Sequence, residues 1–290
     1  MSKMYEALRK AQHDGSGFPM PLESTPYATP EAEEHELLSA EEKVHPNGNH
    51  NGADMRRLPI RVETNSAVIL ARGLDHRVSE QYRLIRTKIV QHPAHPKMLI
   101  ITSPGPGDGK TVSSLNIAGI LALRDDANVL LIEADFRRPT VSSTLGLPSE
   151  PGLANCLRGS CTLQDAIVRV EQFPNLYVLP VGKSEVNPAE LLDTERWQSV
   201  CATVRRHFDY VIVDTPPIGS VADYDLIEAK CDGVIVVVRP DHTDRSLCRA
   251  AFEQIPIDKR LGVVMNCAEE WFLWRTNESY YYGSRASSVF

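Results

Sequence analysis

The sequence lacks a long hydrophobic run. A transmembrane helix needs about 20 consecutive apolar residues, whereas the longest apolar run here, GVIVVVRP, has the length of a single strand. The first ten residues, MSKMYEALRK, also lack the apolar segment of a secretory signal peptide. The sequence therefore predicts a cytoplasmic protein.

Paired cysteines and an excess of basic charge are missing as well. The six cysteines are scattered, with no CxxC pair, which argues against a zinc site and is typical of reduced, mostly buried thiols. The 31 Lys and Arg residues are outnumbered by 38 Asp and Glu residues, so the net charge is -7. A broad nucleic-acid surface needs clustered basic residues, and we therefore expect no nucleic-acid partner.

Composition divides the chain into four segments. Residues 1–12 carry apolar residues at helical spacing, compatible either with a frayed terminus or with a short docking helix. Residues 13–57 are rich in Pro, Gly, Glu, His and Asn and bury too little apolar surface to offset the entropy of ordering, so we predict a disordered linker. A folded domain is expected over 58–268. A flexible tail over 269–290 carries three adjacent tyrosines, Tyr280, Tyr281 and Tyr282.

The predicted domain alternates short apolar runs with amphipathic segments. Six runs, among them MLIITSP, NVLLIEAD and YVIVDTPP, show no polar alternation. Strands of this kind are covered on both faces, as in a parallel sheet between two layers of helices. The sequence predicts a three-layer α/β fold with a mainly parallel sheet.

A glycine-rich turn, SPGPGDGKT, separates the first apolar run from a predicted helix. Its last six residues are Pro106, Gly107, Asp108, Gly109, Lys110 and Thr111. Glycines let backbone N–H groups converge on phosphate oxygens, the lysine offsets phosphate charge, and the threonine hydroxyl can ligate Mg²⁺. The strict pattern GxxxxGK[ST] is not met, because Pro104 occupies the first glycine position. A chance GKT is the alternative, but the strand-to-helix context favours a P-loop that binds ATP with Mg²⁺.

Acidic residues follow two other predicted strands. Glu133 and Asp135 end the run NVLLIEAD, and Asp214 ends YVIVD. Ligands of parallel sheets lie beyond the carboxyl ends of the strands, so we expect these three carboxylates to converge on the phosphates. Asp214 would hold Mg²⁺ through water or through Thr111. One acidic residue at a strand end is common, but three around one loop favour a site.

Together these motifs resemble those of the bacterial tyrosine kinases (BY-kinases), the type that works with a membrane polysaccharide co-polymerase. The resemblance covers about residues 79–282. TSPGPGDGKT is similar to the family's Walker A motif, LLIEADFRRP to its second acidic motif and VIVDTPP to its Walker B motif. SEQYRLIRTKI resembles the E-x-x-R-x-x-R helix through which these kinases assemble into rings, with Glu80, Arg83 and Arg86 at the pattern positions. A solvated charged stripe would also explain these three residues.

The resemblance implies an ATP- and Mg²⁺-dependent autokinase that regulates exopolysaccharide synthesis or export. Its implied partners are other copies in a ring, a cognate tyrosine phosphatase, and an activating membrane co-polymerase or chain-length regulator that recruits it to the inner face of the membrane. The implied catalytic residues are Lys110, Glu133, Asp135 and Asp214. Asp135 or Glu133 would accept the phenolic proton, and Tyr280, Tyr281 and Tyr282 would receive phosphate in trans. Asn266 stands where related P-loop ATPases contact adenine, but a turn cap explains it equally.

One position departs from the family pattern, because Glu133 replaces the first aspartate of the second acidic motif. The extra methylene moves the carboxylate by about 1 Å, and displacements of this size are costly in catalysis. Two alternative functions remain open. One is a partitioning-type P-loop ATPase, whose signature lysine is Gly105 here, and the other is a weakly active nucleotide-binding scaffold of the polysaccharide machinery.

Overall fold

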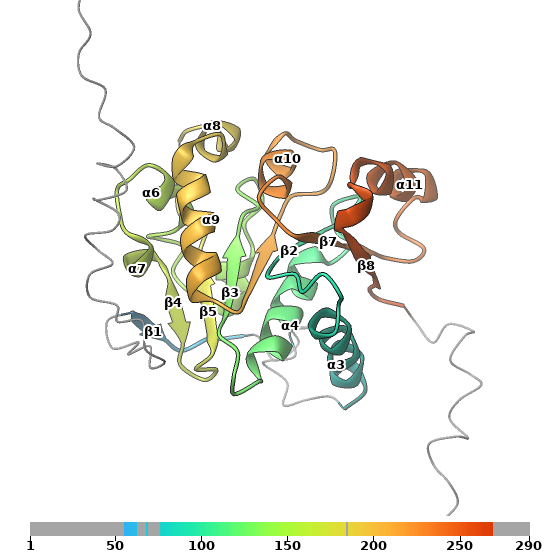
Figure 1. Cartoon of the computed structure of the whole chain (residues 1–290), viewed down its shortest axis with the longest axis horizontal. Helices are drawn as coiled ribbons and strands as arrows, with labels where there is room; N and C mark the ends of the chain where they lie inside the picture. Colours follow the sequence, from blue (N-terminus) through green and yellow to red (C-terminus); the bar gives the residue numbers. More distant parts are fainter. Residues whose placement is uncertain (1–54, 63–67, 69–75, 184, 269–290) are drawn as a thin grey trace, which may run out of the picture. The chain divides into compact units, whose positions relative to one another are not determined.

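The computed structural model describes residues 55–62, 68, 76–183 and 185–268. The predicted N-terminal helix, the linker up to residue 54 and the tyrosine tail lie outside these residues. The described elements (Figure 1) are, in chain order, β1 (Arg56–Leu58), α3 (His76–Val90), β2 (Met98–Thr102), α4 (Lys110–Ala122), β3 (Val129–Glu133), α5 (Val141–Leu145), α6 (Leu153–Leu157), α7 (Leu163–Ala166), β4 (Val168–Val170), β5 (Leu176–Leu179), α8 (Pro188–Leu192), α9 (Glu195–His207), β6 (Tyr210–Asp214), α10 (Asp223–Glu228), β7 (Gly233–Val238), α11 (Arg245–Gln254), the 3₁₀-helix η2 (Ile257–Lys259) and β8 (Arg260–Met265).

The described strands form one eight-stranded sheet in the order β1-β4-β5-β3-β6-β2-β7-β8. Within this part of the chain every neighbouring pair is parallel except β4 with β5. The six apolar runs form β2, β3, β5, β6, β7 and β8, so the predicted fold is confirmed. Two short strands, β1 and β4, were not predicted. Arg56 and Arg57, placed in the linker on composition, belong to β1, because their backbone pairs with β4.

Helices cover both faces of the sheet, which gives the predicted three layers. Side chains alternate along β2: Met98 and Ile100 face a core that includes residues of α6, α8, α9 and α10, whereas Leu99 and Ile101 face a core shared with α3, α4 and α5. Such two-sided burial explains why the central strands read as continuous apolar runs. None of the helices in the described residues is long and apolar enough to cross a membrane.

Strand register brings the chemistry-bearing residues to one edge of the sheet. Glu133 lies opposite Asp214 across the β3–β6 pair, and Ile101 of β2 lies opposite Asp214 on its other side. The glycine-rich loop leaves β2 one residue later and ends at the first residue of α4. All of these groups therefore meet where parallel strands end, which is the edge at which such sheets bind ligands.

Candidate active site

The loop between β2 and α4 has the backbone geometry of a phosphate cradle. Gly107 and Gly109 adopt φ angles of 86° and 90°, in the left-handed region that side chains disfavour. At Gly109 a Cβ would lie 1.9 Å from Nδ2 of Asn266, so this position has no room for a side chain. The helix α4 begins directly afterwards at Lys110, and its N-terminal N–H groups favour an anion at this place.

Residues that follow β7 and β8 hold the loop in shape. The buried Asp108 carboxylate accepts hydrogen bonds from the backbone N–H of Gly105 at 3.1 Å and from the Thr243 hydroxyl at 2.7 Å. The side-chain amide of Asn266 donates to the carbonyl oxygen of Asp108 at 2.9 Å. A Nε2 atom of His242 lies 3.3 Å from the carbonyl oxygen of Pro106. Preorganisation of this kind lowers the entropic cost of binding a ligand.

Lys110 and Asp135 form an ion pair inside the site. The Lys110 Nζ atom lies 2.7 Å from Oδ2 of Asp135, and both side chains are largely buried. The second oxygen, Oδ1, accepts backbone N–H groups of Arg137 at 3.3 Å and Arg138 at 3.0 Å. The Asp135 carboxylate is thus fixed by the turn after β3, while its partner Lys110 reaches it from the first turn of α4.

Asp214 at the end of β6 is a buried carboxylate beside the loop. Its oxygens accept hydrogen bonds from the hydroxyls of Thr111 at 2.8 Å and Ser114 at 3.0 Å. Burial raises the pKa of Asp214 to about 6, although the charge of Lys110 and the two hydroxyls act in the opposite direction. A carboxylate and a hydroxyl are the hard oxygen donors that Mg²⁺ prefers, and a buried carboxylate gains most from a cation. The residues present therefore fit a magnesium ion.

The Glu133 carboxylate forms its hydrogen bonds with the start of α5 and with Val181, and not with Lys110 or Thr111. Its Oε1 accepts the backbone N–H groups of Val141 at 2.7 Å and Ser142 at 3.4 Å, at the start of α5. Its Oε2 accepts the Ser142 hydroxyl at 2.6 Å and the backbone N–H of Val181 at 3.1 Å. The side chain is fully buried. Four hydrogen bonds use both oxygens, and they join β3 to α5 and to the segment after β5.

Comparisons with known proteins identify the family. A family model described as an AAA domain matches residues 97–247. The tyrosine-protein kinase CpsD of Streptococcus agalactiae is 35% identical over 197 residues, which cover 67% of this chain and 85% of that protein. The tyrosine-protein kinase YwqD of Bacillus subtilis is 35% identical over 211 residues, which cover 71% of this chain and 87% of that protein. The chain belongs to the bacterial tyrosine kinase family.

A solved structure agrees with this assignment. The chimerical protein CapA2B2 superposes on this tyrosine kinase with a TM-score of 0.65 at 29% identity, over 72% of this chain and 92% of that chain. The resemblance inferred from the motifs is confirmed. The loop and the acidic strand ends lie inside the region that the family model matches.

The kinase brings together most of the residues selected from the sequence. Lys110 contacts Asp135, Thr111 contacts Asp214, and Pro106 to Gly109 form the loop beside them. Asn266 contacts the loop itself through Asp108. Glu80, Arg83 and Arg86 lie elsewhere, on α3: Arg83 pairs with Glu80, and Arg86 donates to the Ile120 carbonyl oxygen of α4 at 3.5 Å. Tyr280, Tyr281 and Tyr282 lie outside the described residues.

Three residues of the site were missed by sequence reasoning. Ser114 stands one helical turn after Lys110, and this i, i+4 spacing could have placed it on the same helix face as Lys110, whereas its contact with Asp214 joins residues 100 positions apart. Thr243, which holds Asp108, gave no local signal. Asp223 is fully buried on α10 and binds the Arg137 guanidinium through both oxygens, at 3.0 and 3.3 Å. This last contact joins residues 86 positions apart, and only the folded chain reveals it.

Proposed function

We propose that the protein is an ATP-dependent protein-tyrosine autokinase. It transfers the γ-phosphoryl group of ATP to Tyr280, Tyr281 and Tyr282 of a neighbouring copy, and it regulates exopolysaccharide synthesis or export. The observation that carries the proposal is the meeting of the Lys110–Asp135 ion pair with the Thr111–Asp214 contact beside a glycine loop. These are the groups that phosphoryl transfer needs for positioning and charge neutralisation.

The loop and α4 would bind the nucleotide. Backbone N–H groups of Gly107 and Gly109 would surround the phosphates, and Lys110 would turn from Asp135 toward the outer phosphate oxygens. Thr111 and Asp214 would hold Mg²⁺, which supplies charge neutralisation on the β- and γ-phosphate oxygens when bound. Asn266 supports the loop through its hydrogen bond to the carbonyl oxygen of Asp108. In this proposal it also lies next to the base of the nucleotide.

Asp135 would accept the proton of the attacking tyrosine. Once Lys110 contacts phosphate, Oδ2 of Asp135 has lost its ion-pair partner, while Oδ1 stays bound to the backbone of residues 137 and 138. The phenolic oxygen forms a bond to the γ-phosphorus, the bond from that phosphorus to the bridging oxygen breaks, and ADP leaves. The phenolic proton moves to Oδ2. We favour Asp135 over Glu133 as the base, because four hydrogen bonds already occupy the Glu133 oxygens.

The assembly and the partners proposed for this kinase are those that the family resemblance implies. A ring built through Glu80, Arg83 and Arg86 of α3 would present the tail of one copy to the site of the next. A membrane co-polymerase or chain-length regulator would recruit this cytoplasmic kinase to the inner face of the membrane and activate it. A cognate tyrosine phosphatase would reset the tail.

The direct test incubates the purified full chain with Mg·ATP and detects phosphotyrosine. Lys110→Met should abolish the signal, because it removes the side chain proposed to hold the outer phosphates. Lys97→Met is the matched control: this lysine is exposed at the opposite end of β2, so its loss should leave the signal unchanged. Release of inorganic phosphate without any phosphotyrosine would instead support a partitioning-type ATPase and overturn the kinase proposal.

A second variant locates the acceptors. Replacement of all three tail tyrosines, Tyr280, Tyr281 and Tyr282, by Phe keeps the apolar bulk and removes the nucleophiles. Most of the incorporated phosphate should therefore disappear. Mass spectrometry of the wild-type protein should place the phosphate on residues 280–282. Phosphate found mainly elsewhere would contradict the proposed acceptor site while leaving the kinase assignment intact.

A further inference from the structure

Strand β8 differs from the other predicted strands because it lies at the edge of the sheet and remains apolar on both faces. It pairs with β7, and within the described residues no other strand pairs with its second edge. Val263 and Met265 are 48% and 57% exposed. An edge strand with exposed apolar side chains is a ready template for a further strand.

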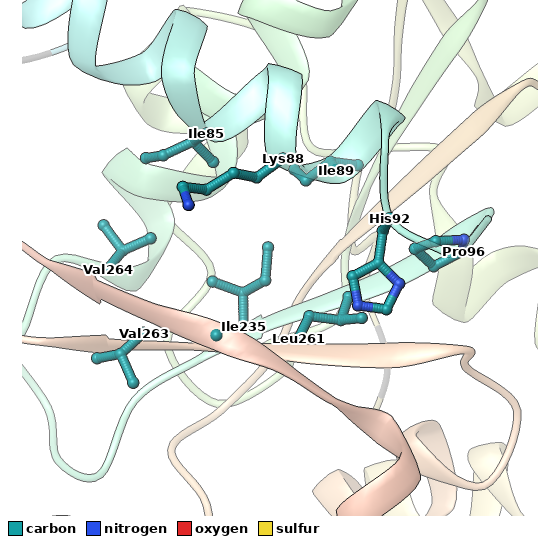
Figure 2. Close-up of a pocket in the computed structure, with 10 residues that line it drawn as sticks. Ile85, Lys88, Ile89, His92, Pro96, Ile235, Leu261, Val263 and Val264 are labelled. Carbon is teal, nitrogen blue, oxygen red and sulfur yellow. The ribbon is translucent and has the colours of Figure 1, made fainter. Parts of the chain in front are cut away.

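The opposite face of β8 lines a groove against α3. Figure 2 shows Val264 and Leu261 directed toward α3, whereas Val263 points to the other side of the strand. Ile85 and Ile89 of α3 and Ile235 of β7 complete the apolar lining of a groove of about 100 Å³, and Lys88 and His92 add basic groups to its lining.

The chain that follows β8 has the composition and the length to cover both faces. It leaves the strand through Cys267, whose φ of 51° lies in the left-handed region that chain-reversing hairpin loops use. Glu269 and Glu270 come next, followed by the run WFLW at 271–274. Four consecutive apolar residues are typical of a strand covered on both sides. The five residues 266–270 have the length of an ordinary hairpin loop. The two acidic residues would lie at the Val264 end of the groove, where Figure 2 shows the amino group of Lys88, whose charge they complement.

We propose that residues Trp271 to Trp274 add to the edge of β8 as an antiparallel strand. Alternate side chains of a strand point to opposite faces, so two of the four would enter the α3–β8 groove and two would cover Val263 and Met265. The docked strand would run back toward the amino end of β8, away from the phosphate loop.

This docking limits where the tyrosines can go, a consequence that rests on the autokinase function proposed above. A strand of four residues spans about 10 Å from its first Cα atom to its last, so Trp274 would lie about that far from the loop edge of the sheet. Six Cα-to-Cα steps lead from Trp274 to Tyr280, and they reach at most about 22 Å when fully extended. Without docking, the residues 269–279 would reach about 40 Å. Docking therefore roughly halves the reach of Tyr280, which disfavours its return to its own site and favours transfer between copies.

Hydrogen exchange of the full chain, measured without ATP, tests the docking itself. In the wild-type protein, amides of Leu261–Met265 and of residues 85–92 should exchange at least tenfold more slowly than in the Trp271→Ala/Trp274→Ala variant. Tyr280→Ala/Tyr282→Ala, which removes two aromatic residues beyond the proposed strand, should exchange like the wild type. Equal exchange in wild type and the Trp variant would overturn the proposal. Protection that disappears on dilution would also overturn it, since the occupant would then be a second copy.

A second pair of variants examines the surface of β8. Val263→Asp places a charge under the proposed strand and should abolish the protection. Ile257→Asp, at an apolar residue that is 81% exposed just before β8 and outside the groove, should leave it unchanged. Protection that survives Val263→Asp would contradict the proposed position of the strand.

Autophosphorylation at different protein concentrations tests the functional consequence separately. At concentrations low enough for light scattering to show monomers, the wild-type rate per subunit should fall in proportion to dilution, whereas the Trp271→Ala/Trp274→Ala variant should gain a component that does not depend on concentration. A wild-type rate independent of concentration in this monomeric range would overturn the limit on reach. Absence of phosphotyrosine in every variant would instead refute the autokinase function, while the exchange result would still decide the docking.

Discussion

The clearest prediction concerns Glu133, which the family pattern places in catalysis and the structure places in support of α5. In Glu133→Gln, one side-chain oxygen still accepts from Val141 and Ser142, but the new NH₂ group faces the backbone N–H of Val181. The Ser142 hydroxyl can rotate to accept, whereas the Val181 N–H cannot. The variant thus loses a charge-assisted hydrogen bond and leaves a buried donor unpaired, at a cost of roughly 2–4 kcal/mol.

This cost converts into a measurable change in melting temperature. For a domain of about 200 residues, 1 kcal/mol shifts the midpoint by about 2–4 °C, so Glu133→Gln should melt roughly 5–15 °C below the wild type. Glu171→Gln is the matched control, because Glu171 is exposed and should change stability by at most about 0.5 kcal/mol. Circular dichroism at increasing temperature measures both variants.

Autophosphorylation measured well below the melting midpoint completes the test. Folded Glu133→Gln should retain the wild-type rate within a few-fold, while Asp135→Asn should lose about a hundredfold or more, as expected for a general base. A Glu133→Gln variant that melts like the wild type but has lost its activity would refute the assignment of the proton to Asp135.

Two further predictions address the loop and the helix α3. Gly109→Ala should weaken ATP binding in calorimetry at least tenfold, because its Cβ collides with Asn266. Adding Asn266→Ala should recover only part of the affinity, since the strain of a φ of 90° remains. Full recovery of the affinity would show that the backbone at this position is not strained. Arg83→Ala/Arg86→Ala should shift the protein from oligomer to monomer in light scattering and lower transfer between copies. Arg124→Ala, at a half-buried arginine two residues after α4, should do neither. A wild-type protein that is already monomeric would contradict the ring.

Much of the fold was predictable because its main determinant is local. The central strands are buried on both faces, and burial on both faces removes polar residues from a run of five or six. Strands β1 and β4 were not predicted from the sequence, because they have three residues each and include arginines. Their place in the sheet depends on pairing between segments more than 100 positions apart, which composition does not reveal.

The candidate site was predictable in its residues but not in their partners. Strand ends identify Asp135 and Asp214, because parallel strands share one ligand-binding edge. Side-chain direction is different: Glu133 and Asp135 are two residues apart, yet one contacts α5 and Val181 while the other contacts Lys110. That divergence depends on where α5 begins and where β5 ends. Likewise, the support of the loop by Thr243 comes from a residue 135 positions after Asp108.

The charge balance of the site predicts that its substrate is Mg·ATP and not free ATP. Lys110 is already neutralised by Asp135, and Asp214 is ionised above its pKa of about 6, so these side chains carry a net negative charge at neutral pH. A triphosphate without a cation would enter against this charge in a buried setting, where repulsion is weakly screened. Removal of Mg²⁺ by EDTA should therefore weaken ATP binding at least tenfold in calorimetry. Asp214→Asn removes both a metal ligand and a negative charge, so it should weaken Mg·ATP binding and strengthen the binding of metal-free ATP, which brings the two dissociation constants together. Equal affinities for the two forms in the wild-type protein would show that the buried carboxylate plays no part in holding the ion.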